Sequence, residues 1–169
     1  MYHLSYTKSK TADRSRGPKM ICMQRELVLN EGYAELVDFF SEIGERKVLL
    51  ICDGMYQYFR VAKYFDCLLD PVKFLVHDRV VNSESVKNAV SLYKRENCTV
   101  VMAVGGDGVI STARCVALSD EDTELIVMPT TAGGFVLSEK TKYSYDRSKA
   151  YDIIFPSTVI IDNSSDSLF

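Results

Sequence analysis

The stretch TVVMAVGGDGVISTARCVAL, residues 99–118, decides the fold class of this protein. It opens with a continuous apolar run, residues 99–105, which is typical of a parallel strand buried on both faces. The glycine-rich turn GGDG, residues 105–108, follows, and small and apolar residues then recur at helical spacing over residues 110–118. The order of strand, glycine turn and helix is typical of one repeating unit of an α/β protein.

Further apolar runs end in a turn or a polar residue, and helical spacing fills the intervals between them. The predicted strands are Met20–Leu29, Lys47–Asp53, Val72–Asp78, Glu124–Thr130 and Thr158–Asp162. The predicted helices lie around Leu36–Ile43, Phe59–Leu69 and Val86–Tyr93, the last with Asn82 or Ser83 as its N-cap. This alternation predicts an α/β fold, an open, mostly parallel, Rossmann-like sheet with helices on both faces. Residues 135–155 alternate polar and aromatic side chains and predict a C-terminal hairpin.

Length and composition indicate one folded domain. The chain has 169 residues, of which 47% are hydrophobic and 25% charged, a balance that excludes a mostly disordered chain. We expect a flexible basic arm over residues 1–19, a domain over residues 20–165, and a tail over residues 166–169 where a second domain would begin. The arm carries five basic residues and one acidic residue within a net charge of -3. We interpret it as a solvated terminus and expect no binding to nucleic acid.

Several residue types exclude other classes of protein. No run reaches the roughly 18 apolar residues of a membrane span, and the N-terminus lacks the apolar core of a signal peptide. We therefore expect a cytoplasmic protein without a membrane partner. The five cysteines form no CxxC pair, which favours buried thiols in a reducing compartment. With His3 and His77 as its two histidines, the chain is expected to contain no metal ligand set.

The residues that follow the strands carry the candidate site, because ligands of open parallel sheets bind at the carboxyl ends of the strands. The GGDG turn allows close backbone approach, and the helix that it begins offers free N–H groups to a phosphate. Hydroxyl donors and a strand-end carboxylate complete a nucleotide site. The candidate cofactor-binding residues are Asp53, Gly105, Gly106, Asp107, Gly108, Thr130, Thr131 and Gly133. We nominate no catalytic residue, and we interpret Ser111 and Arg114 as surface residues of the helix.

The order of these motifs resembles the N-terminal, cofactor-binding domain of iron-containing alcohol dehydrogenases, and more loosely that of glycerol dehydrogenases and dehydroquinate synthases. The motifs are the strand-end Asp53, VVNSES, the glycine turn, IVMPTTAGG and FPSTVIID. The resemblance implies that residues 105–108 contact the pyrophosphate of NAD(P), that Thr130 and Thr131 contact the nucleotide, and that Asp53 meets the adenosine ribose. An acidic residue there favours NAD over NADP.

The resemblance also implies an oxidoreductase whose metal ligands lie in a second, helical domain. We expect this chain to need a metal-bearing partner chain or domain for hydride transfer. Leu168 and Phe169 suggest an exposed apolar face that a partner or a homodimer covers. The chain departs from the family pattern at Asp107, Gly108, Ser111 and Arg114, where the family usually has Gly, Ser, Asp and Lys.

A second resemblance competes with the first. The turn GGDG, followed later by AGGFVLSE, is similar to the GGDGT turn of NAD kinases and diacylglycerol kinases, in which the aspartate is expected. It implies a phosphotransferase in which Asp107 activates a hydroxyl, although Val109 stands where those kinases have threonine. A non-catalytic nucleotide-binding module is the third alternative.

Overall fold

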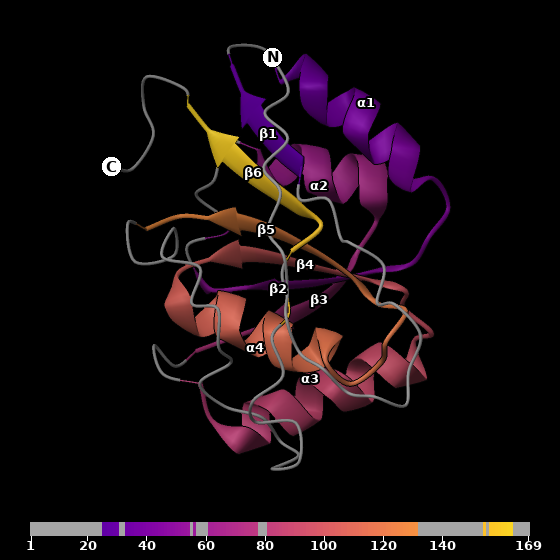
Figure 1. The fold of residues 1–169 in the computed structure, drawn as a ribbon, viewed down its shortest axis with the longest axis vertical. Coiled ribbons are helices and arrows are strands. Elements are labelled where there is room, and N and C mark those ends of the chain that lie inside the picture. Colours follow the sequence, from indigo (N-terminus) through magenta and orange to yellow (C-terminus); the bar gives the residue numbers. More distant parts are fainter. Residues whose placement is uncertain are drawn as a thin grey trace, which may run out of the picture.

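A computed structural model describes residues 25–30, 33–54, 56, 61–77, 81–131, 154 and 156–163. Strands and helices alternate along the chain until the last two strands (Figure 1). The elements are β1 (Arg25–Leu29), α1 (Ala34–Ile43), β2 (Val48–Cys52), α2 (Ala62–Leu69), β3 (Val72–Leu75), α3 (Ser83–Arg95), β4 (Val100–Gly105), α4 (Asp107–Ala117), β5 (Glu124–Pro129) and β6 (Thr158–Asp162).

The strands form one six-stranded sheet in the order β1-β6-β5-β4-β2-β3, and each of its pairings is parallel. The predicted α/β class and parallel sheet are therefore confirmed. The predicted hairpin, apart from Ile154, lies outside the described residues, as do the basic arm and the C-terminal tail.

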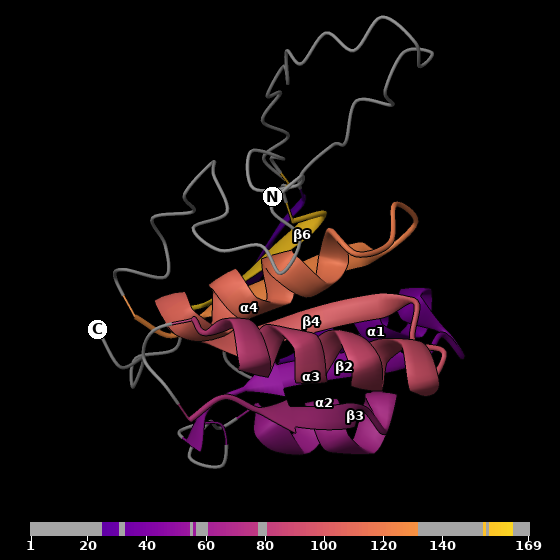
Figure 2. The same cartoon turned by 90° about the horizontal axis from the view of Figure 1, so that it is seen from below.

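Alternate residues of the central strands point into two separate hydrophobic layers. Leu50 of β2 and Met102 of β4 face α1 and α2, whereas Leu49 and Val101 face α3 and α4. Figure 2 shows these helix pairs on opposite faces of the sheet. Both faces are covered, which explains why these strands read as continuous apolar runs.

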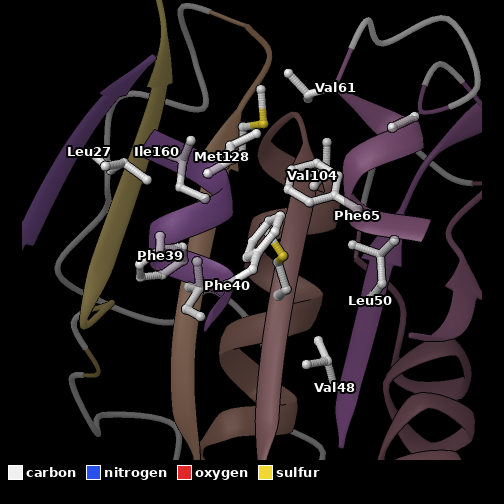
Figure 3. Packing of buried hydrophobic residues seen from close by; sticks show 14 of the residues in the cluster. Leu27, Phe39, Phe40, Val48, Leu50, Val61, Phe65, Val104, Met128 and Ile160 are labelled. Carbon is white, nitrogen blue, oxygen red and sulfur yellow. The ribbon is translucent and has the colours of Figure 1, made fainter. Parts of the chain in front are cut away.

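The layer beneath α1 and α2 is rich in aromatic rings. Phe40 of α1 and Phe65 of α2 lie with ring centroids 5.3 Å apart, and both are buried over β2 and β4 (Figure 3). Burial of one such side chain contributes about 1.5–3 kcal/mol relative to its exposure to water. This packing fixes α2 against the sheet.

Local signals in the sequence set the limits of α3. The side chain of Asn82 accepts a hydrogen bond from the amide of Ser85 over 2.7 Å, which confirms Asn82 as the N-cap. Lys94 and Arg95 occupy the last turn, where positive charge stabilises the negative end of the helix dipole.

The apolar run Val72–Asp78, like residues 99–105, predicts a strand that is buried on both faces, and this prediction is wrong for β3. This strand lies at the edge of the sheet, ends at Leu75 rather than at residue 78, and exposes Lys73 and Leu75. A short apolar run does not distinguish an edge strand from a central one, because the order of strands depends on long-range contacts. Within the described ranges, no helix has the length and apolar character needed to cross a membrane.

Candidate functional site

The strand order reverses between β2 and β4, which places a topological switch point at their carboxyl ends. From β2 the chain moves outward to β3, returns to β4 beside β2, and then continues outward in the other direction through β5. The helix after β2 packs on one face of the sheet and the helix after β4 packs on the other. Ligands of open α/β sheets bind in the crevice outside such a point.

The turn after β4 brings two glycines to this edge of the sheet. A Cβ atom added to Gly105 would lie 2.7 Å from a methyl carbon of Val109, which is a severe overlap with a buried side chain. A Cβ atom added to Gly106 would lie 3.3 Å from the hydroxyl oxygen of Thr131. Gly105 is therefore required by the packing of α4, and Gly106 leaves backbone accessible beside Thr131.

The first turn of α4 presents backbone donors at the same place. Gly106 is the N-cap and contributes no side chain to the cap, while the amide of Ile110 donates to its carbonyl oxygen over 3.1 Å. The amides of the first helical turn precede the first intrahelical donor, so they are available to an anion. The partial positive charge of the helix dipole adds to this preference.

The turn after β5 lies directly beside the glycine turn. Gly105 pairs with Pro129 at the end of the ladder between β4 and β5, and the amide of Thr130 donates to the carbonyl oxygen of Gly105 over 3.0 Å. Thr131 follows and is exposed. The structure thus brings together the predicted residues Gly105, Gly106, Thr130 and Thr131.

Asp53 reaches the same edge from β2. Cys52 pairs with Val104 in the ladder between β2 and β4, so Asp53 and Gly105 are the next positions on neighbouring strands. Asp53 is half-buried. Burial, and then the nearby carboxylate of Asp53, raise the pKa of the Cys52 thiol to about 11. The Asp53 carboxylate therefore lies close enough to Cys52 to add to the effect of burial.

Asp107 and Gly108 occupy the first turn of α4 with different exposures. Asp107 is exposed, and Gly108 is buried with its carbonyl oxygen accepting from the Thr112 hydroxyl over 2.8 Å. A carboxylate in the first turn is favourable to the helix dipole but repels a bound phosphate unless it contacts a hydroxyl, a cation or solvent. The last predicted site residue, Gly133, lies outside the described residues.

The interpretation of Arg114 as a surface residue is wrong. Its side chain is 3% exposed, and burial lowers the pKa of the guanidinium below its ordinary value. Nearly every residue from Gly108 to Ala117 is buried, so α4 has almost no solvent face on which a polar residue could lie. Helical periodicity assigns a charged residue to the outside and does not detect a helix that is enclosed.

Cys22 lies outside the described residues, and the four cysteines that the structure describes follow the prediction with one exception. Cys52, Cys98 and Cys115 are buried free thiols, whereas Cys67 is a free thiol exposed on α2. Among the described side chains, no group of three or more His, Cys, Asp or Glu residues is placed to hold a metal ion.

The parallel sheet, its order of strands and the helices on both faces define a Rossmann-like α/β domain. The family model of iron-containing alcohol dehydrogenase matches residues 25–163, and the chain belongs to that family. The resemblance read from the sequence motifs is thereby confirmed. No curated protein sequence matches the chain.

Solved structures with the same fold share little sequence with this chain. Sulfoacetaldehyde reductase from Bifidobacterium kashiwanohense, in complex with NAD+, aligns with a TM-score of 0.60 and 17% identity over 81% of this chain and 44% of its own. Maleylacetate reductase from Rhizobium sp. strain MTP-10005 gives a TM-score of 0.60 and 19% identity over 96% and 43%. NADH-dependent butanol dehydrogenase A from Thermotoga maritima gives 0.57 and 21% over 81% and 42%. The chain thus spans less than half the length of these proteins.

Proposed function

We propose that this chain is the NAD-binding domain of an alcohol dehydrogenase-like oxidoreductase. The observation that carries the proposal is the junction at the switch point, where the Gly105–Gly106 turn, the start of α4 and Thr130–Thr131 meet beside Asp53. The NAD+ complex of sulfoacetaldehyde reductase, which has the same fold, supports the choice of ligand.

The residues at the junction suit the parts of a dinucleotide. Backbone donors of residues 106–108 would hold the pyrophosphate, and the Thr130 and Thr131 hydroxyls would donate beside it. Asp53 would accept hydrogen bonds from the adenosine ribose and repel a 2′-phosphate, which favours NAD over NADP. When bound, NAD supplies the hydride acceptor or donor of the reaction. A Cβ atom at Gly106 would reduce the space beside Thr131, so glycine fits this role.

Hydride transfer would require residues beyond those of this domain. We propose that a metal-bearing domain or partner chain supplies the Lewis acid, as the family description implies iron. We also propose that a partner chain, or a second copy of this chain, covers part of this domain. These 169 residues by themselves are expected to bind NAD without turning over an alcohol.

Asp107 favours a second candidate function. An exposed carboxylate in the first turn of α4 suits a phosphotransferase that activates a hydroxyl, and it suits a dinucleotide pyrophosphate less well. That function requires ATP with Mg²⁺ and should be abolished by Asp107→Asn.

Parallel isothermal titrations with NAD, NADP and Mg-ATP separate these functions. The proposal predicts that the wild-type protein binds NAD, and binds NADP more weakly. The preference for NAD over NADP should fall in Asp53→Asn. It should stay unchanged in the control Asp38→Asn, which removes an exposed carboxylate from α1. Binding of Mg-ATP without NAD would favour the phosphotransferase. Absence of heat from all three ligands would overturn both functions and leave a non-catalytic module.

A further inference from the structure

Tyr56 connects the candidate site to the elements around it. It lies in the turn after Asp53 and is 4% exposed, and its amide donates to the Asp53 carbonyl oxygen over 3.1 Å. Its ring stacks on Phe65 of α2 with the centroids 6.3 Å apart. Tyr56 thus contacts Asp53 through its backbone and α2 through its ring.

The hydroxyl group of Tyr56 forms hydrogen bonds in addition to the packing of its ring. It donates to Oδ1 of Asp66 on α2 over 2.8 Å, with the carbonyl oxygen of Ala62 as a second acceptor at 3.1 Å. The same Asp66 oxygen lies 2.8 Å from Nζ of Lys73 on β3, and the Lys73 ammonium lies 5.6 Å from the centroid of the Tyr56 ring. One buried hydroxyl therefore joins the turn to a helix and to an edge strand.

This hydroxyl stays a donor at neutral pH. Burial, and then the hydrogen bond to Asp66, raise the pKa of Tyr56 above its ordinary value. The Asp66 carboxylate that accepts from Tyr56 also forms the ion pair with Lys73. A hydrogen bond to a charged group is stronger than a neutral one, and a buried hydroxyl that loses its partner is costly.

We infer that Tyr56 is a positioning residue for Asp53, and that its hydrogen bond to Asp66 sets how strongly the site distinguishes NAD from NADP. Because this role concerns ribose contact by Asp53, it rests on the proposed NAD site. A carboxylate held in one place accepts from a ribose diol and repels a 2′-phosphate, whereas a mobile one does both less well. The hydroxyl of Tyr56 would therefore affect selectivity without touching the ligand.

The test compares two buried tyrosines whose hydroxyl groups form hydrogen bonds to other side chains. Tyr56→Phe removes the bond to Asp66, and the control Tyr93→Phe removes the 2.8 Å bond between Tyr93 and Thr123, which lies at the amino end of β5. Thermal melts measure the stability of each variant, and isothermal titration measures its affinities for NAD and NADP. We expect about a tenfold loss of NAD affinity and a smaller NAD-to-NADP ratio in Tyr56→Phe. Tyr93→Phe should change the melting temperature and leave the ratio at the wild-type value.

Substitutions of Asp66 give an independent readout. Asp66→Asn keeps an oxygen that accepts from Tyr56 and should lower the NAD-to-NADP ratio less than Asp66→Ala, which removes the acceptor altogether. Equal ratios in the wild type, Tyr56→Phe and Asp66→Ala would overturn the positioning role while leaving the NAD site standing. A wild-type protein that binds neither NAD nor NADP would overturn the site and the role together.

Discussion

The amide of Thr130 donates to the carbonyl oxygen of Gly105 over 3.0 Å. This backbone hydrogen bond joins the residues after β4 to those after β5 at the candidate site. The contact extends the ladder between these strands beyond its last pair, Gly105 with Pro129. It fixes Thr131 next to Gly106, where an added Cβ atom would meet its hydroxyl at 3.3 Å. The shape of the site is therefore determined by backbone geometry as much as by side chains.

Gly105→Ala is expected to destabilise the protein by about 1–3 kcal/mol, because the new methyl group would overlap Val109 and push α4 from the sheet. Chemical denaturation measures the free energy of unfolding. Gly54→Ala is the control, since nothing lies within 4 Å of its added Cβ atom. Equal unfolding free energies for the two variants would contradict the packing described for Gly105.

Gly106→Ala is expected to weaken NAD binding by about tenfold with a smaller effect on stability, because its Cβ atom fills the approach to the first turn of α4. Isothermal titration with NAD and a thermal melt give the two quantities. If Gly106→Ala destabilised the protein as much as Gly105→Ala does, its loss of NAD affinity would be a structural effect. The role of Gly106 in binding would then be wrong.

Phe65→Ala is expected to lower the free energy of unfolding by about 3–5 kcal/mol, because Phe65 is fully buried against Phe40 and Tyr56. Leu68→Ala on the same helix removes a side chain that is 43% exposed and should change stability by about 0.5 kcal/mol or less. Urea denaturation of the two variants checks the difference. Similar losses would show that α2 does not pack as described.

The buried thiols should resist alkylation at pH 8. The pKa of Cys52 is raised to about 11 and that of Cys115 to about 12, in each case first by burial, so their reactive thiolates are scarce until the pH approaches those values. Iodoacetamide should label the exposed Cys67 in the native protein and the buried thiols only after unfolding, as read by peptide mass spectrometry. Rapid native labelling of Cys52 would contradict its burial.

The same shift predicts a fall in stability at high pH. The folded-state pKa of Cys52 lies above its ordinary value of 9.0, so its contribution is complete below pH 9 and is lost as the pH rises toward 11.

The sequence predicted the parts of the fold that depend on local patterns. Apolar runs located β2, β4 and β5, and the glycine turn located the start of α4, because these signals lie within a few residues of one another. The edge position of β3 and the burial of Arg114 were missed, since both depend on which elements become neighbours.

The candidate site was predictable to a similar extent. Strand-end residues pointed to Asp53, Gly106 and Thr131, because the carboxyl ends of parallel strands share an edge. The connection of Tyr56 to Asp66 and Lys73 was not predictable, because it joins a turn, a helix and a strand through tertiary packing. The aromatic residue shortly after a strand-end aspartate was the one signal present in the sequence.

The most direct test of NAD binding at the switch point is a titration of the ¹⁵N-labelled protein with NAD, followed by amide chemical shifts. We predict that the largest changes fall on Asp53, Gly106, Asp107 and Thr131, at the carboxyl ends of β2, β4 and β5. Amides at the opposite end of the sheet, such as those of Lys47 and Thr123, should stay unchanged. Shifts confined to that opposite end, or no shifts at saturating NAD, would contradict the proposed site.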